Sequence, residues 1–199
     1  MAEKIHFSVG VEDLKRLQES LDEVSAKSVA QAHAMALTRA MTTGEAYAAK
    51  FFQESYPQVK QALIKKKYIN QYINKKSSKV EDIVGVLEIS GRGMSLENLG
   101  AKKTKTGARY KGAGHTVEVK GAFFAKVYAN NYGPHWWKRE TNERFPVKFL
   151  YGPSPFTVFK FEKNQEAVAE IMRDRYLEEI PRQLNFYMQR AFNRLIGYK

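Results

Sequence analysis

Hydrophobic residues at the start of the chain change their spacing from two positions to three or four. Residues 5–9 alternate between apolar and polar side chains, which predicts a short strand that ends at Gly10. Over 11–24, leucine and valine recur every three or four residues, which is typical of an amphipathic helix. The chain is therefore expected to open with a strand followed by a helix.

A second, longer helix is predicted over residues 28–53. Alanine has the best helix propensity and recurs along this stretch, while Gly44 is a mild interruption. Pro57 marks the end, because the residue before a proline avoids the α region. Small residues on one helix face let another helix approach closely, either within the domain or between copies in an oligomer. Packing within the domain is the commoner arrangement of the two.

The middle of the chain is rich in predicted strands, and its end is helical. A short basic helix is predicted over 58–67, and 68–76 is ambiguous with a β-like pattern. Further strands are predicted at 82–90, 115–119, 123–128 and through the aromatic stretch 136–151. A terminal helix is predicted from Gln165, and Pro181 is expected to end or kink it before the apolar stripe continues.

This order of segregated helices and strands predicts an α+β fold. We expect long N-terminal helices, a central antiparallel β-sheet with an extended basic arm, and a C-terminal helix. The length of 199 residues suits a single domain over 1–199, and 43% hydrophobic residues are enough to form a core.

The net charge of +12 is concentrated in two short segments. Residues 60–79 contain seven lysines and no acidic residue, and 100–121 contain six basic residues and one glutamate. The second segment is also rich in glycine, so about 100–114 is predicted to be a flexible basic loop or arm. Such segments contact DNA phosphate or an acidic neighbour, although a charge run is often only a solvated surface. The candidate contacts to a DNA channel or an acidic partner are Lys65, Lys66, Lys67, Lys75, Lys76, Lys102, Lys103, Lys105, Arg109 and Lys111.

Aromatic and basic residues interleave over 128–139. Such residues stack on exposed bases, or form a protein interface, or flank a core. Adjacent residues on a strand point to opposite faces, so at most one of Trp136 and Trp137 is naturally buried and the other needs a partner or exposure. This mildly favours an interface, and its candidate residues are Tyr132, His135, Trp136, Trp137 and Arg139.

Catalytic chemistry has little support in the residues. The sequence has no cysteine, and its four histidines are widely separated with no metal-ligand spacing. Glu166, Glu170 and Asp174 can chelate a divalent ion as in some nucleases, but this spacing is more typical of a solvated helix face. We therefore assign no catalytic, metal or cofactor-binding residue and expect no cofactor. No apolar run approaches a membrane span and no signal-peptide core is visible, so we expect a soluble protein kept in a cytosol-like compartment.

Short motifs in a fixed order run through nearly the whole chain. They are Ala36-Leu-Thr-Arg-Ala40, Val59-Lys followed by Ile64-Lys-Lys-Lys, Gly121-Ala-Phe-Phe-Ala, Arg144-Phe-Pro-Val-Lys, Gly152-Pro-Ser-Pro and Leu177-Glu-Glu-Ile-Pro-Arg-Gln-Leu. In this order they resemble the minor tail protein Z family of tailed bacteriophages and prophages. None of the motifs is catalytic.

The resemblance implies a structural virion protein without enzyme activity, at the head-proximal end of the tail. Its role would be tail completion, head–tail joining or a neck or collar ring around the DNA channel. The implied partners are further copies in a homo-oligomeric ring, neighbouring tail and neck proteins and genomic DNA bound without sequence preference, with no membrane. The implied location is the virion, and the host cytoplasm during assembly. The alternatives are a non-sequence-specific nucleic-acid-binding module and, third, a metal-dependent nuclease.

Overall fold

The computed structural model of the protein describes residues 3–7, 26–74, 80–126 and 134–195. The chain divides into two compact units, although one domain was predicted. The strand-rich unit comprises Met1–Ala2, Ala49–Tyr68 and Ser90–Lys160, and the helical unit comprises Glu3–Ala48, Ile69–Ile89 and Phe161–Lys199. The helix predicted over 11–24 lies outside the described residues.

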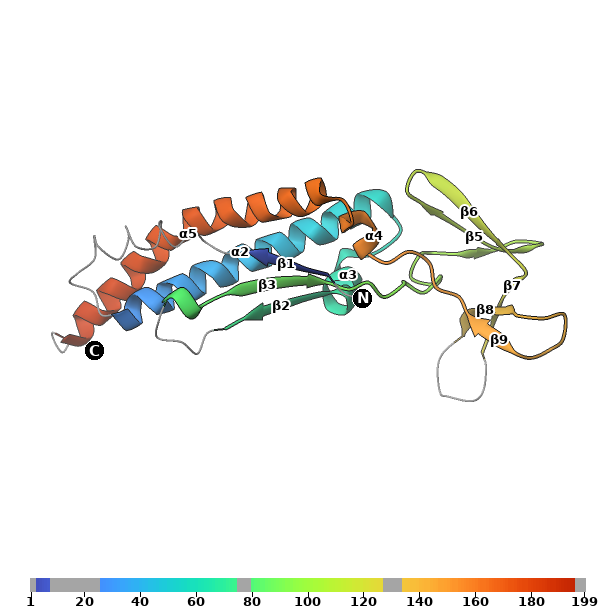
Figure 1. The fold of residues 1–199 in the computed structure, drawn as a ribbon, viewed down its shortest axis with the longest axis horizontal. Helices are drawn as coiled ribbons and strands as arrows, with labels where there is room; N and C mark the ends of the chain where they lie inside the picture. The colour runs from blue at the N-terminus through green and yellow to red at the C-terminus, as the bar shows by residue number, and fades with distance from the viewer. Residues whose placement is uncertain (1–2, 8–25, 75–79, 127–133, 196–199) are drawn as a thin grey trace. The chain divides into compact units, whose positions relative to one another are not determined.

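The helical unit places two long helices over a small antiparallel sheet. The sheet has the order β1 (Glu3–Phe7), β3 (Gly85–Ile89) and β2 (Ile69–Ile73), and a short 3-10 turn η1 (Val80–Asp82) precedes β3. The helices are α2 (Ala26–Ser55), whose last turns belong to the strand-rich unit, and α5 (Glu162–Leu195). Figure 1 shows α2 and α5 side by side along this sheet.

One face of β3 is covered by α2. Leu87 and Ile89 are buried, whereas Val86 and Glu88 between them are partly exposed. A Cβ built on Gly85 would lie 3.1 to 3.2 Å from side-chain atoms of Met41 and Leu37, so the helix packs directly on the strand. The strand predicted over 82–90 is confirmed over Gly85–Ile89, where a two-residue period buries one face.

Gly44 lies inside an unbroken helix. A Cβ at this position would be 2.4 Å from both Cγ and Sδ of Met172, which is fully buried on α5. The absence of a side chain at Gly44 therefore lets the two helices of the same chain approach closely. At this position the small residue on α2 allows close packing within the unit.

Helix α5 continues through Pro181 to Leu195, so of the two alternatives predicted at this proline, an end or a kink of the helix, the end is wrong. Proline has no N–H to offer the carbonyl of Leu177 four residues earlier. Buried Ile180 and Leu184 on either side of the proline hold the helix against the unit, and this packing outweighs the lost hydrogen bond.

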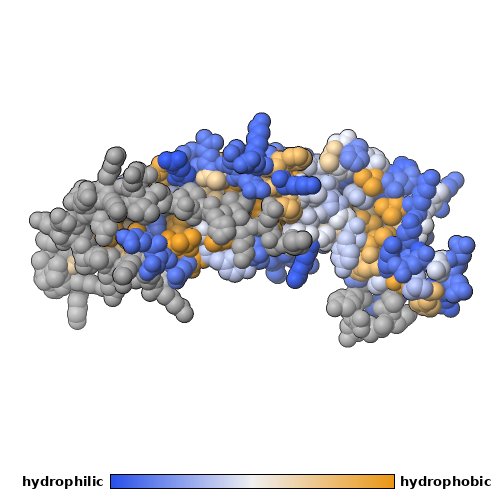
Figure 2. All heavy atoms as spheres, viewed as in Figure 1, coloured by the Kyte–Doolittle hydropathy of each residue, from blue (hydrophilic) through white to orange (hydrophobic). Residues whose placement is uncertain are grey.

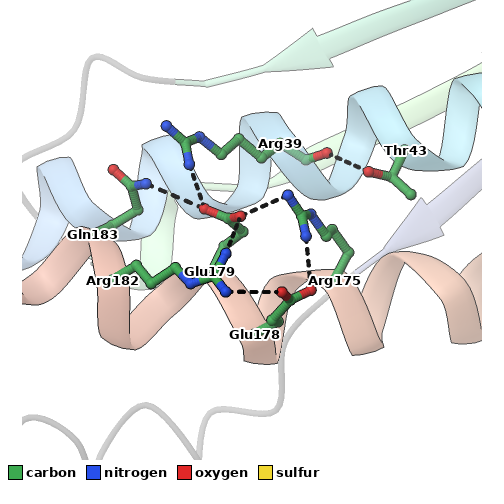
Figure 3. A network of polar contacts seen from close by, with 7 residues as sticks. All are labelled: Arg39, Thr43, Arg175, Glu178, Glu179, Arg182 and Gln183. Carbon is green, nitrogen blue, oxygen red and sulfur yellow. Dashed lines mark hydrogen bonds and ion pairs between the residues drawn. The ribbon is translucent and has the colours of Figure 1, made fainter.

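A buried carboxylate joins the two helices. The side chain of Glu179 on α5 is only 1% exposed. Its Oε2 accepts hydrogen bonds from Arg39 Nη1 on α2 at 2.6 Å and from Gln183 Nε2 at 3.3 Å. Its Oε1 lies 2.7 Å from Arg175 Nη2 and 3.5 Å from Arg182 Nη1 (Figure 3). Burial raises the pKa of Glu179, but the hydrogen bonds from Arg39 and Gln183 and the charges of Arg175 and Arg39 outweigh it, so the pKa is lowered.

His33 fills a second polar position between the layers of this unit. Its Nε2 lies 3.2 Å from the carbonyl oxygen of Ile83, and its Nδ1 lies 2.7 Å from the hydroxyl of Tyr176. A carbonyl only accepts, so Nε2 carries the proton and Nδ1 accepts from the tyrosine. Burial lowers the pKa of His33, and the Ile83 carbonyl opposes this in part. His33 is therefore a neutral residue that packs between the layers of the unit.

In the part of the chain that the structure describes, the strand-rich unit contains six short strands in two antiparallel sheets. After the last turns of α2 it contains α3 (Gln61–Tyr68), which confirms the predicted short basic helix. One sheet has the order β4 (Lys102–Lys103), β5 (Gly107–Gly112) and β6 (His115–Lys120). The other has the order β7 (Ala122–Ala125), β8 (His135–Arg139) and β9 (Val147–Phe149), and α4 (Phe156–Phe159) follows it. The α+β class is confirmed, with the antiparallel strands distributed over three small sheets.

The segment 100–114, predicted to be a flexible arm, is largely folded into β4 and β5, so that prediction is wrong. Ala108, Tyr110 and Gly112 are buried along β5. A Cβ on Gly112 would lie 2.2 Å from Cε1 of Tyr56, whose ring packs on the strand. Tyr56 stacks in turn on Phe52, with ring centroids 4.7 Å apart. Gly112, one of the glycines that suggested flexibility, instead makes room for the ring of Tyr56.

Candidate nucleic-acid interface

The net positive charge of the protein lies entirely in the strand-rich unit. Its residue ranges contain 18 Lys and Arg residues against 5 Asp and Glu, a net charge of +13. The rest of the sequence contains 15 basic and 16 acidic residues, a net charge of −1. A polyanion would therefore be attracted to the strand-rich unit and hardly to the rest of the chain.

The exposed face of the β4–β5–β6 sheet is basic. Residues opposite each other on neighbouring strands share a face, and Lys102, Arg109 and Glu118 form one such row across the sheet. Lys111 and Lys120 lie on the same face, two residues from Arg109 and Glu118, and all five side chains are exposed. The basic face is defined by its four cations, Lys102, Arg109, Lys111 and Lys120.

Glu118 moderates this basic face without neutralising it. Its Oε1 accepts a hydrogen bond from the Thr106 hydroxyl at 2.5 Å, and Arg109 lies 3.8 Å from its Oε2. The Thr106 hydrogen bond lowers the pKa of Glu118, slight desolvation opposes it, and the charges of Arg109 and Lys120 add to the lowering. The carboxylate stays ionised and partners Arg109, which leaves the three lysines of the face for other ligands.

The remaining predicted basic residues that the structure describes lie outside the basic face, and all of them are exposed except Lys65, which is partly buried. Lys105 occupies the turn between β4 and β5, and Lys103 lies beside Lys102 at the edge of the sheet. Lys65, Lys66 and Lys67 form the last turn of α3, where lysine is also favoured by the helix dipole. Gln58, in the loop before α3, donates its amide to the carbonyl of Lys111. Lys75 and Lys76 lie outside the described residues.

The β7–β8–β9 sheet brings aromatic residues together on one face. Phe123, Trp137 and Phe149 are directly opposite one another on the three strands. His135 and Arg139, also predicted for an interface, lie on this face two residues from Trp137. Over β5–β9 apolar and hydrophilic side chains lie next to one another (Figure 2).

Trp136 points to the opposite face, as the alternation predicted. It is 3% exposed and packs 5.2 Å from the ring of Phe124, whereas Trp137 is only partly buried. Trp136 is therefore a core residue of the sheet, and the prediction that it belongs to an interface is wrong. Tyr132 lies outside the described residues.

Glu97 anchors the start of β8. Its Oε1 accepts from the backbone N–H of Trp136 at 2.8 Å and lies 3.1 Å from Nδ1 of His135. The ring of His135 lies 4.7 Å from that of Phe149. His135 thus packs against Phe149 on the aromatic face, and Glu97 holds the start of the strand in place.

Sequence reasoning missed Phe123 and Phe149 as members of the aromatic face. The sequence predicted their strands, but it did not predict the strand register that places both residues beside Trp137.

Comparisons with known proteins found no matching family model, no matching curated protein and no matching solved structure. The chemistry of the site therefore rests on two surfaces of the strand-rich unit, one basic and one aromatic.

The acidic residues of α5 form no metal site. Glu166, Glu170 and Asp174 are all exposed, and within the described ranges no group of three or more His, Cys, Asp or Glu side chains could hold a metal ion.

Among the helices that the structure describes, none is long and apolar enough to cross a bilayer.

Proposed function

We propose that this protein is a structural virion protein of a tailed phage, at the head-proximal end of the tail. It would complete the tail, join it to the head or form a neck or collar ring, in contact with neighbouring tail and neck proteins and with genomic DNA. The role is one of assembly and not of catalysis, and its place is the virion, reached through the host cytoplasm. The resemblance to the minor tail protein Z family supports this proposal.

The observation that carries the nucleic-acid contact is the confinement of the net charge to one unit. Four cations lie together on the basic face of β4–β5–β6, opposed by one glutamate. Cations on one face of an antiparallel sheet can contact several phosphates of a nucleic acid, and such contacts do not depend on its sequence. Copies of such a subunit around a channel would multiply weak contacts of this kind.

The same observation favours a second function, a free non-sequence-specific nucleic-acid-binding module. The two functions differ in the affinity of the isolated protein. A dedicated module binds duplex DNA as a monomer, at micromolar concentration or better, whereas a ring subunit needs its neighbours before its weak contacts add up.

A matched pair of triple variants tests the basic face. We expect Lys102→Gln, Lys111→Gln and Lys120→Gln together to lower duplex affinity at low salt by about 10- to 100-fold, and the salt slope by up to about 3, because three phosphate contacts are lost. The control removes three exposed cations of α5, Lys163, Arg173 and Arg190, and should change duplex affinity less than about 2-fold. Fluorescence anisotropy of a labelled duplex over a salt series gives both quantities. Equal losses in the two triple variants would contradict the assignment of the basic face.

Disruption of the gene in the parent phage tests the assembly role. We expect separate full heads and normal-length tails in the lysate, because a missing tail-completion protein leaves both assemblies intact but unjoined. Negative-stain electron microscopy distinguishes this from tails that join but fail to infect, which would indicate a role in positioning DNA in the channel. Normal infectious particles would overturn the assembly role and favour the free nucleic-acid-binding module.

A further inference from the structure

The aromatic face of the β7–β8–β9 sheet remains incompletely covered. Phe123, Trp137 and Phe149 are each only partly buried although they form one cross-strand row. The rings of Trp137 and Phe149 meet edge to face with centroids 5.3 Å apart, and the indole N–H of Trp137 donates to the carbonyl of Ala125 at 3.1 Å. The indole is therefore held in a fixed orientation at the centre of the face.

The row continues into an exposed ring at one end and reaches a cation at the other. Tyr151 is 64% exposed and lies 4.5 Å from Phe149, with the two rings inclined by 32°. At the other side of the face, the guanidinium of Arg139 lies 5.9 Å from the ring centroid of Phe123. The face thus presents fixed π surfaces with a charge beside them.

We propose that this face binds unpaired nucleotides, with bases stacked on Tyr151, Phe149 and Trp137 and a phosphate held by Arg139. Every base has a π face, so stacking of this kind tolerates any sequence, and arginine adds cation–π and phosphate contacts. A duplex does not fit, because its bases are already stacked and their faces are closed to the protein.

The charge around the face favours a nucleic acid over a protein partner. Lys126 and Arg144 lie in the loops that flank this sheet, whereas Lys138 and Lys148 lie on its other face, and the unit as a whole has a net charge of +13. An apolar protein partner would have to desolvate Arg139 without a counter-charge, whereas phosphate supplies one at each nucleotide. This inference rests on the nucleic-acid contact of the proposed function. It adds that the aromatic face binds single-stranded nucleic acid.

Tryptophan fluorescence isolates this face in solution. The sequence has two tryptophans, and Trp136 is buried on the opposite side of the sheet, so a Trp136→Phe variant leaves Trp137 as the reporter. Titration of the full chain with an oligothymidylate is expected to quench Trp137, because a stacked base contacts the indole. Titration with a duplex of equal length is expected to leave the emission nearly unchanged.

Two variants and a matched control test the stacking. Phe149→Leu keeps an apolar side chain in the sheet but loses the π face, and Tyr151→Ala removes the exposed ring. Each is expected to weaken oligothymidylate binding by roughly 5- to 150-fold, the range measured for loss of one stacked base, with duplex affinity within about 2-fold of wild type. Phe124→Ala is the control, since Phe124 is 46% exposed on the other face of the same sheet. It should leave both affinities within about 2-fold.

The outcomes separate this inference from the function on which it rests. Duplex binding without quenching by oligothymidylate would overturn the aromatic face as a single-strand site and leave the proposed nucleic-acid contact standing. Binding of neither nucleic acid by the isolated protein would overturn both the single-strand site and the free nucleic-acid-binding module, whereas the assembly role is decided by the gene disruption. Equal loss in Phe124→Ala, or equal quenching by polyglutamate, would overturn the stacking and indicate a general effect on the sheet or an acidic protein partner.

Discussion

Replacement of Glu179 by glutamine is expected to lower the free energy of unfolding by about 2 kcal/mol at neutral pH, the value typical of hydrogen bonds to a charged group. The side chain of Glu179 is 1% exposed, and Arg39, Arg175 and Arg182 converge on it from two helices. All three arginines are partly exposed, so water screens each pair and keeps the loss below that of a fully buried ion pair. Urea unfolding of the two proteins measures the difference.

Glu178 provides the matched control. It is the preceding residue on α5 and pairs with Arg175 and Arg182 at 2.7 and 3.2 Å, but its side chain is 49% exposed. Glu178→Gln is therefore expected to cost less than about 1 kcal/mol. A loss in Glu178→Gln that equals the loss in Glu179→Gln would show that burial of the carboxylate is unimportant.

The Glu179 contribution should also depend on pH. The folded pKa of Glu179 is lower than its ordinary value of 4.5, so in acid the unfolded chain binds the proton first. The stabilisation is present above about pH 4.5 and is lost as the pH falls through the folded pKa. The unfolding free energies of wild type and Glu179→Gln should therefore converge in acid. A gap that stays constant with pH would contradict this assignment.

Replacement of Gly44 by leucine is expected to destabilise the helical unit by about 3 kcal/mol, the upper end of the usual cost of overpacking. A Cβ alone would lie 2.4 Å from Cγ and Sδ of Met172, and these atoms are fully buried between α2 and α5. Leucine improves helix propensity by about 1 kcal/mol over glycine, so destabilisation despite this gain isolates the steric effect. Thermal and urea unfolding measure it.

A second substitution, on the facing helix, tests whether the destabilisation by Gly44→Leu comes from steric conflict with Met172. Met172→Ala alone is expected to destabilise by about 2 to 5 kcal/mol, as for other buried methionines. Combined with Gly44→Leu, it should cost less than the sum of the two, because the leucine fills part of the space that methionine leaves. Strict additivity would mean that Gly44 and Met172 do not constrain each other.

Periodic patterns predicted the elements because their cause is local. The alternation in β3 and the alanine content of α2 depend on residues close in sequence, and both elements lie where the pattern indicated. The alternation also predicted that Trp136 and Trp137 face opposite ways, which follows from the pleat of any strand.

The structural role of the glycines could not be predicted from the sequence. In 100–114 it suggested a mobile arm, yet Gly112 lies under the ring of Tyr56 and Gly44 lies under Met172. A glycine has the same local signature whether it loosens the backbone or admits a neighbour. The neighbour in each case comes from a distant part of the chain, so only packing distinguishes the two.

The sequence by itself determined the total charge, the positions of most helices and strands, and the presence of an aromatic, basic segment. Only the tertiary structure decided that the chain passes between two units near residues 48, 68, 89 and 160, which confines the excess charge to one of them. It likewise decided that Phe123 and Phe149 flank Trp137, and that Arg39 reaches Glu179. Composition and periodicity are sums over neighbouring residues, whereas strand register and charge pairing depend on which distant segments fold against each other.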